Sequence, residues 1–98
     1  MTMAKFELNI YGENDAILKT YSTDVIRWKL FMEAVALQEK IKNEDVSVQI
    51  ESVSAFIKAV FVGLTDAELE NADAFDIMNT FRQIVVKANA INPNGKNA

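Results

Sequence analysis

The stretch KFELNIYGENDAILKTY, residues 5–21, decides the fold class of this chain. It opens with the apolar residues Phe6, Leu8 and Ile10, each separated by a residue that would point to the opposite side of an extended chain. This period of two is typical of a strand with one buried face. GEND then supplies turn-forming residues, and AILKTY has the β-branched and aromatic content of a return strand. The stretch therefore predicts a β-hairpin.

After this hairpin the apolar residues change to the period of a helix. We expect a first helix over residues 24–42. Ser22 or Thr23 can cap it, since either hydroxyl can accept a hydrogen bond from a free amide of the first turn. The expected core face is a narrow arc at helical spacing. This arc consists of Ile26, Leu30, Ala34, Leu37 and Ile41.

Two further main helices and a short one are predicted downstream. The apolar pattern that begins at Val46 is sustained too long for a strand, and Gly63 is expected to end that helix. TDAE, from Thr65, is a capping box that starts a short helix, and Asp73 caps the last one. The expected core residues are Val46, Ile50, Val53, Phe56, Ile57, Val60 and Phe61 in the second helix and Ile77, Met78, Phe81, Ile84, Val85 and Ala88 in the last.

Together these elements predict an α+β fold, with an N-terminal β-hairpin packed on a small bundle of three main helices plus one short helix. We expect one domain over residues 1–91 and a flexible tail over residues 92–98, where NPNGKNA reads as a turn and a frayed end. Half of the 98 residues are hydrophobic and 24% are charged, which is the composition of a globular domain.

The composition also excludes or disfavours several kinds of function. The chain has no cysteine and no histidine, so it lacks thiolate metal ligands, the commonest general base and every Ser-His or Cys-His nucleophile arrangement. We therefore expect no enzyme, no metal and no cofactor. The net charge of −4 argues against a nucleic-acid surface. No apolar run reaches the roughly 20 residues that span a bilayer, and no signal peptide is recognisable, so we expect a soluble intracellular protein.

Acidic residues are densest around the short helix. A cation site would need their oxygen atoms to converge, but the spacing of an EF-hand is absent. We expect these carboxylates to stabilise two helix N-termini through the macrodipole instead. The residues concerned are Asp66, Glu68, Glu70, Asp73 and Asp76.

The first helix carries more apolar side chains than one core needs. In VIRWKLFMEAV, residues 25–35, Trp28, Phe31, Met32 and Val35 lie beyond a polar border, on the side opposite the core arc. Two explanations are open, and they can share the face between them: the hairpin covers this second face, or the face contacts another chain. Trp, Phe and Met are enriched at the cores of protein interfaces. These four residues are therefore the candidate partner-binding residues.

Several segments also carry a resemblance to a known family. They are FELNIYG near the start, TDVIRWKLF at the entry to the first helix, and GLTDAELENAD before the last helix. In these segments, and in overall pattern over residues 4–91, the chain resembles the tail assembly chaperones of long-tailed phages and prophages of Gram-positive bacteria. The match includes no catalytic motif.

This resemblance implies a non-enzymatic protein of the host bacterial cytoplasm. Such chaperones bind the long, hydrophobic tape-measure protein, keep it soluble and help tail-tube subunits polymerise around it. The tape-measure protein is thus the expected partner, and the tail-tube protein and a second copy of the chain are further candidates. The family also implies a longer form made by ribosomal frameshifting. Gly95, Lys96 and Asn97 can be encoded as GGA AAA AAC, which contains a slippery run.

Two other functional classes stay open. One is a structural tail or head-completion protein that is retained in the virion, and the other is a small protein-binding regulatory module such as an antitoxin. Antitoxins usually carry a basic DNA-binding segment, which this sequence lacks. Mass spectrometry of purified particles separates a chaperone, which should be missing, from a structural protein.

Overall fold

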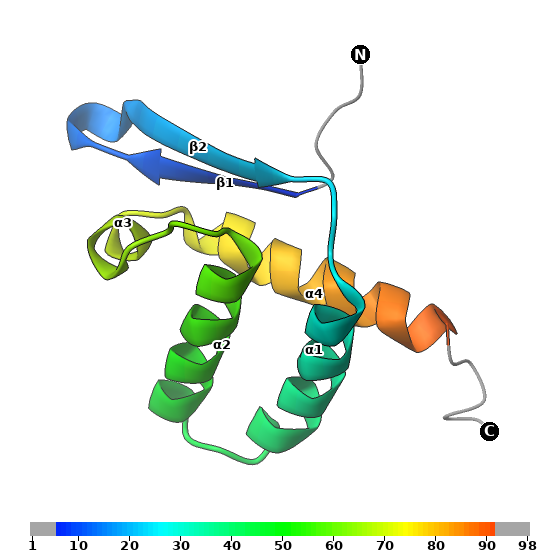
Figure 1. Ribbon diagram of the computed structural model, residues 1–98. Helices are drawn as coiled ribbons and strands as arrows, with labels where there is room; N and C mark the ends of the chain where they lie inside the picture. The colour runs from blue at the N-terminus through cyan, green and yellow to red at the C-terminus, as the bar shows by residue number, and fades with distance from the viewer. Residues whose placement is uncertain (1–5, 92–98) are drawn as a thin grey trace.

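The computed structural model describes the backbone of residues 6–91 and the side chains of residues 6–87. The predicted α+β fold is confirmed: a two-stranded antiparallel hairpin precedes four helices (Figure 1). The predictions about the tail at 92–98, the slippery run within it and the burial of Ala88 lie outside this description.

The hairpin consists of β1 (Phe6–Tyr11) and β2 (Ile17–Thr23). A short 3-10 turn, η1 (Glu13–Asp15), joins them, with Asn14 in the left-handed region at φ 59°. The pairing runs from Phe6 opposite Thr23 to Ile10 opposite Lys19, and it shifts before Tyr11 pairs with Ile17. This shift is a β-bulge that leaves Leu18 as the extra residue of β2.

The first helix is shorter than predicted. Helix α1 spans Trp28–Ile41 and follows an extended Arg27, so the expected start near residue 24 is wrong. Ser22 and Thr23 do not cap the helix because both belong to β2. The Thr23 hydroxyl bonds to the backbone of Val25 two residues on, which makes a local turn between strand and helix.

The second helix, α2, spans Val46–Val60. Gly63 lies just beyond it at φ 95°, a left-handed conformation that suits glycine. The side chains of Val46 and Ile50 are 69% and 61% exposed, so their predicted burial is wrong. They lie at the end of α2 that extends away from α4 and the hairpin, where no second layer covers them (Figure 1).

Both predicted caps near the end of the chain are confirmed. In α3 (Asp66–Glu70), the Thr65 hydroxyl accepts a bond from the Glu68 amide and the Glu68 carboxylate accepts one from the Thr65 amide, each at 3.1 Å. In α4 (Ala74–Ile91), Asp73 accepts hydrogen bonds from the amides of Phe75 and Asp76. One free amide of the first turn of α3 and two of the first turn of α4 therefore have side-chain partners.

The core-facing arc of α4 differs slightly from the prediction. Met78 is 57% exposed, whereas Thr80 is buried. The buried arc is centred on Ile84 and includes Thr80, which places Met78 just outside it on the solvent side.

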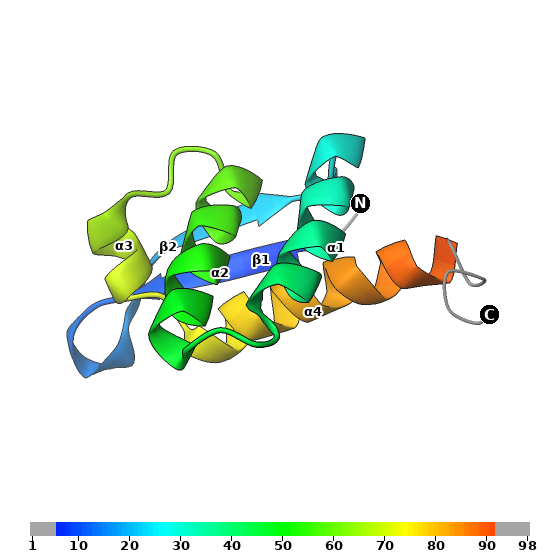
Figure 2. The same cartoon turned by 90° about the horizontal axis from the view of Figure 1, so that it is seen from below.

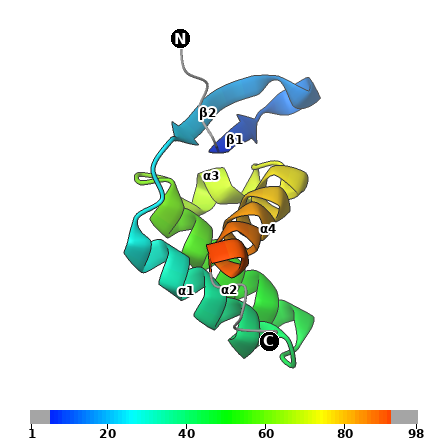
Figure 3. The ribbon, with the colours of Figure 1, turned by 90° about the vertical axis from the view of Figure 1, so that its right-hand side faces the viewer.

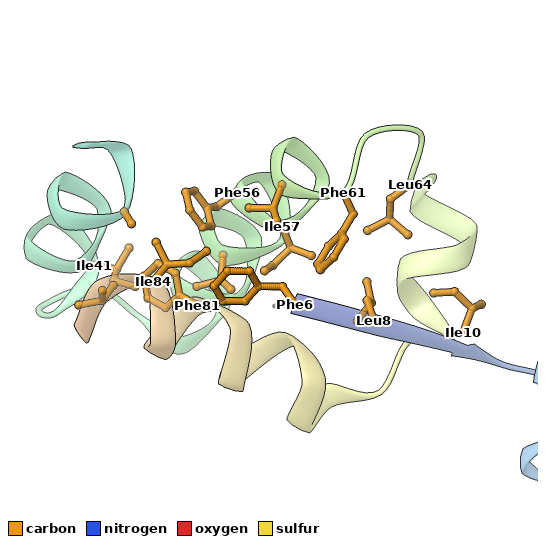
Figure 4. Packing of buried hydrophobic residues seen from close by; sticks show 14 residues of the cluster. Phe6, Leu8, Ile10, Ile41, Phe56, Ile57, Phe61, Leu64, Phe81 and Ile84 are labelled. Atoms are coloured by element: carbon orange, nitrogen blue, oxygen red, sulfur yellow. The ribbon is translucent and has the colours of Figure 1, made fainter. Parts of the chain in front are cut away.

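The elements form stacked layers. Helices α1 and α2 lie side by side, and α4 packs against both of them and against β1 (Figures 1 and 2). Inward-pointing side chains of β1 meet those of α2, the following loop and α4 in one cluster (Figure 4). Its members are Phe6, Leu8, Ile10, Ala34, Ile41, Val53, Phe56, Ile57, Val60, Phe61, Leu64, Phe81, Ile84 and Val85.

Candidate partner-binding surface

The four candidate residues share the outer side of α1, which we name the α1 outer surface (Trp28, Phe31, Met32 and Val35). Trp28 is 61% exposed and Met32 is 55% exposed, while Phe31 and Val35 are half-buried. The hairpin packs on α4 rather than on α1, so it does not cover this side (Figure 3). The hairpin therefore leaves Trp28 and Met32 uncovered, and contact of this surface with another chain stays a prediction.

Phe31 connects this surface to the interior. Its side chain packs against the buried cluster, together with that of Leu30. The Trp28 ring meets the Phe31 ring edge-on, with centroids 6.0 Å apart and an interplanar angle of 69°. This geometry is favourable for aromatic pairs, and it places the exposed indole on an anchored neighbour. An aromatic side chain presented in this way loses little conformational entropy when a partner binds.

A further exposed apolar residue and two charges lie close to Trp28 in the sequence. Val25, in the segment that leads into α1, is 63% exposed. Exposed Arg27 and Lys29 flank the Trp28 side chain in sequence, so the apolar patch begins beside two positive charges in a chain that is acidic overall. An apolar centre with a charged rim is the usual anatomy of a protein interface.

Sequence analysis missed a second apolar surface, on α4. Phe75 is 85% exposed and lies on the same side of the helix as the exposed Met78 and Val86. Phe75 and Val86 are separated by three helical turns and lie opposite the core arc. A search for apolar residues outside the core arc of the last helix, like the one made for the first, would have found them.

Charged groups connect the hairpin to α3. The Tyr21 hydroxyl lies 2.5 Å from Glu68 Oε1 and 3.1 Å from the Gly63 carbonyl, and the Lys19 ammonium lies 3.3 Å from Glu68 Oε2. Hydrogen bonds from Tyr21, and then from the Thr65 amide, lower the pKa of Glu68 to about 2. Bonding to Tyr21 and Glu68 raises the pKa of Lys19. These contacts are structural, since they tie β2 to the loop and cap of α3.

A shallow groove of about 300 Å³ lies between α1 and α2 and is bordered by Glu33 and Lys40. Among residues 6–87, no three acidic, histidine or cysteine side chains converge on a point where a metal ion could sit. Within the described part of the chain, no helix combines the length and the apolar character needed to cross a membrane.

Comparison with known proteins adds no assignment. A scan against protein-family models found no match, and neither did searches of curated protein sequences and of solved structures. Function is therefore inferred from the residues of the chain, their geometry and the resemblance described above.

Proposed function

We propose that this protein is a non-enzymatic tail assembly chaperone of a long-tailed phage or prophage, active in the cytoplasm of the bacterial host. In this proposal the α1 outer surface binds the tape-measure protein and keeps it soluble while the tail tube assembles around it. The observation that supports the proposal best is the exposure of Trp28 and Met32 on a helix that is anchored to the core by its other side.

An exposed apolar surface is a liability for a protein that acts alone, because it favours aggregation. It is useful to a protein whose client is itself apolar and helical. The apolar side of a client helix can lie along α1, with Trp28 and Met32 as the residues that lose the most water. Met32 adds adaptability, since its unbranched side chain can repack against different client side chains.

The test is co-expression with segments of the tape-measure protein encoded in the same gene cluster. The structure favours the double variant Trp28→Ser/Met32→Ser over one that includes Phe31, because Phe31 packs against the core and its loss would also destabilise the fold. The matched control is Phe75→Ser/Met78→Ser, which removes two similarly exposed residues from α4.

We expect the wild-type chain and the α4 control to keep a tape-measure segment soluble and to co-purify with it. The α1 variant should retain its helical circular dichroism but lose the segment. If the α1 variant protects the segment as well as the wild type does, the proposed site is wrong. If the chain is found in purified particles, the proposed role as a chaperone is wrong and the structural alternative replaces it.

A further inference from the structure

The sheet has one covered edge and one open edge. A short segment before α4 pairs with the far edge of β1: the Tyr11 amide donates to the Asn71 carbonyl at 2.9 Å, and the Asp73 amide donates to the Asn9 carbonyl at 3.2 Å. The Asn9 amide donates to the Asp76 carboxylate. No described residue pairs with the outer edge of β2, which lies farther from α4 than β1 does (Figures 1 and 3).

The same bonds show which groups of β2 face this open edge. Because the amide and carbonyl of Asn9 both point away from β2, Asn9 and Thr20 form a pair without mutual backbone hydrogen bonds. In an antiparallel ladder such pairs alternate with hydrogen-bonded ones. The backbone amide and carbonyl of Thr20 therefore point outward, and so do those of Ser22, two residues further on.

This edge has little of the usual protection beyond the β-bulge at Leu18, which lies near the start of β2. Natural edge strands are commonly guarded by prolines or by exposed charges, lysine above all. The sequence of β2, ILKTYST, contains no proline and a single charged residue, Lys19. The Lys19 ammonium is drawn inward, 4.5 Å from the centre of the Tyr21 ring and 3.3 Å from Glu68. The charge is thus paired with Glu68 of α3, although the Lys19 side chain itself stays 52% exposed.

We propose that β2 pairs antiparallel with β2 of a second copy of this chain, in a register centred on Thr20, so that the two hairpins form one four-stranded sheet. This proposal rests on the hairpin alone and does not depend on the proposed function.

The register follows from direction and charge. With Thr20 opposite Thr20 of the other copy, the two residues exchange both of their outward backbone bonds, and Ser22 lies opposite Leu18. All seven residues of β2 are then matched. Lys19 falls opposite Tyr21, so the two lysine charges do not face each other. A register centred on Lys19 would oppose like charges and would use backbone groups that already bond to β1.

Pairing also adds to the stability of this small sheet. An isolated two-stranded hairpin is marginal in water, and packing on a helix or adding strands stabilises it. This hairpin already packs on α4 through β1, and pairing would add hydrogen bonds along β2, its less covered strand. In the paired sheet the two Thr23 residues lie about 20 Å apart along the strands, at opposite ends. Each α1 follows its own Thr23, so the two α1 helices begin near opposite ends of the paired sheet. If the proposed function holds, the dimer offers two client-binding surfaces.

The first test is the variant Thr20→Pro in the full chain, measured by sedimentation velocity over a range of concentrations. Proline removes an amide hydrogen that bonds to nothing within one copy, so the monomer should keep its fold while the pairing is blocked. The control, Thr20→Ala, loses the hydroxyl bond to the Asn9 side chain but keeps the amide.

We expect the wild type and Thr20→Ala to sediment as dimers, with twice the 11.0 kDa mass of one chain, and Thr20→Pro to sediment as a monomer with unchanged circular dichroism. A monomeric wild type, or a Thr20→Pro variant that remains dimeric, overturns the proposal. A third result would assign the edge to a strand of the client instead. In that case the wild type is a monomer that binds a tape-measure segment, and Thr20→Pro abolishes this binding.

A crosslinking experiment decides the register even if the proline variant fails to fold. The chain has no cysteine, so Thr20→Cys introduces a unique thiol. In the proposed dimer the two Thr20 Cα atoms lie about 5.5 Å apart. Glu7 lies on the same face of the sheet but on β1, and the two Glu7 Cα atoms of the dimer lie about 20 Å apart. A short bismaleimide should join Thr20→Cys chains and not Glu7→Cys chains, and equal crosslinking of both would overturn the register.

Discussion

The packing of α4 can be tested with one substitution made at two positions of the same helix. Phe81 is 9% exposed, and its ring meets that of Phe56 edge-on at 5.6 Å, in the centre of the cluster. Truncating a buried phenylalanine to alanine costs about 3–5 kcal/mol. The aromatic pair argues against the lower end of that range, because such pairs contribute about 0.5–1.5 kcal/mol beyond burial. For Phe81→Ala we therefore expect a loss of about 4 kcal/mol.

That loss is a large share of the whole, since domains of this size unfold with about 5–15 kcal/mol. Urea denaturation followed by far-ultraviolet circular dichroism should show the midpoint lowered by about 2–3 M, for an m-value near 1.5 kcal/mol/M. The matched control is Phe75→Ala, since Phe75 is 85% exposed. Its stability should change by less than about 0.5 kcal/mol, as for other exposed positions. Equal losses for the two variants would show that α4 does not face the core as described.

The lowered pKa of Glu68 and the backbone conformation of Gly63 lead to two further predictions. The pKa of Glu68 is lowered from 4.5 to about 2 in the folded chain, so its contribution to stability is complete above pH 4.5 and is lost as the pH falls toward 2. In thermal melts, the melting temperature should therefore fall less over that pH range for Glu68→Gln than for the wild type. An equal fall in both proteins would exclude Glu68 as a cause of the acid-induced loss of stability. Gly63→Ala should lower the free energy of unfolding by about 1 kcal/mol or more, because alanine is strained at a φ of 95°. A clash would not contribute, because the nearest side-chain atom, in Tyr21, lies 4.0 Å from the added Cβ. Gly63→Asn should cost less, because asparagine tolerates this conformation, and a neutral Gly63→Ala in urea denaturation would contradict the argument.

The sequence was informative where the signal is local. The alternation of Phe6, Leu8 and Ile10 was enough to predict a strand and its buried face, because a period of two has no other common cause. The caps at Thr65 and Asp73 were equally readable, since a capping side chain bonds to amides only two or three residues away. For the candidate surface, the helical period was enough to predict that Trp28 and Met32 lie away from the core side of α1, where both are exposed.

Only the tertiary structure decided which apolar faces are covered. Val46 and Ile50 have the same helical period as the buried residues of α2, and Met78 lies beside the core arc of α4, yet all three are exposed. The exposure of Trp28 and Met32 was likewise decided by the tertiary structure, because the hairpin packs on α4 and leaves both side chains uncovered. Periodicity reports which residues share a side of one element. Whether that side is buried depends on where a second element packs against the first. The position of the second element is set by contacts between residues far apart in the chain.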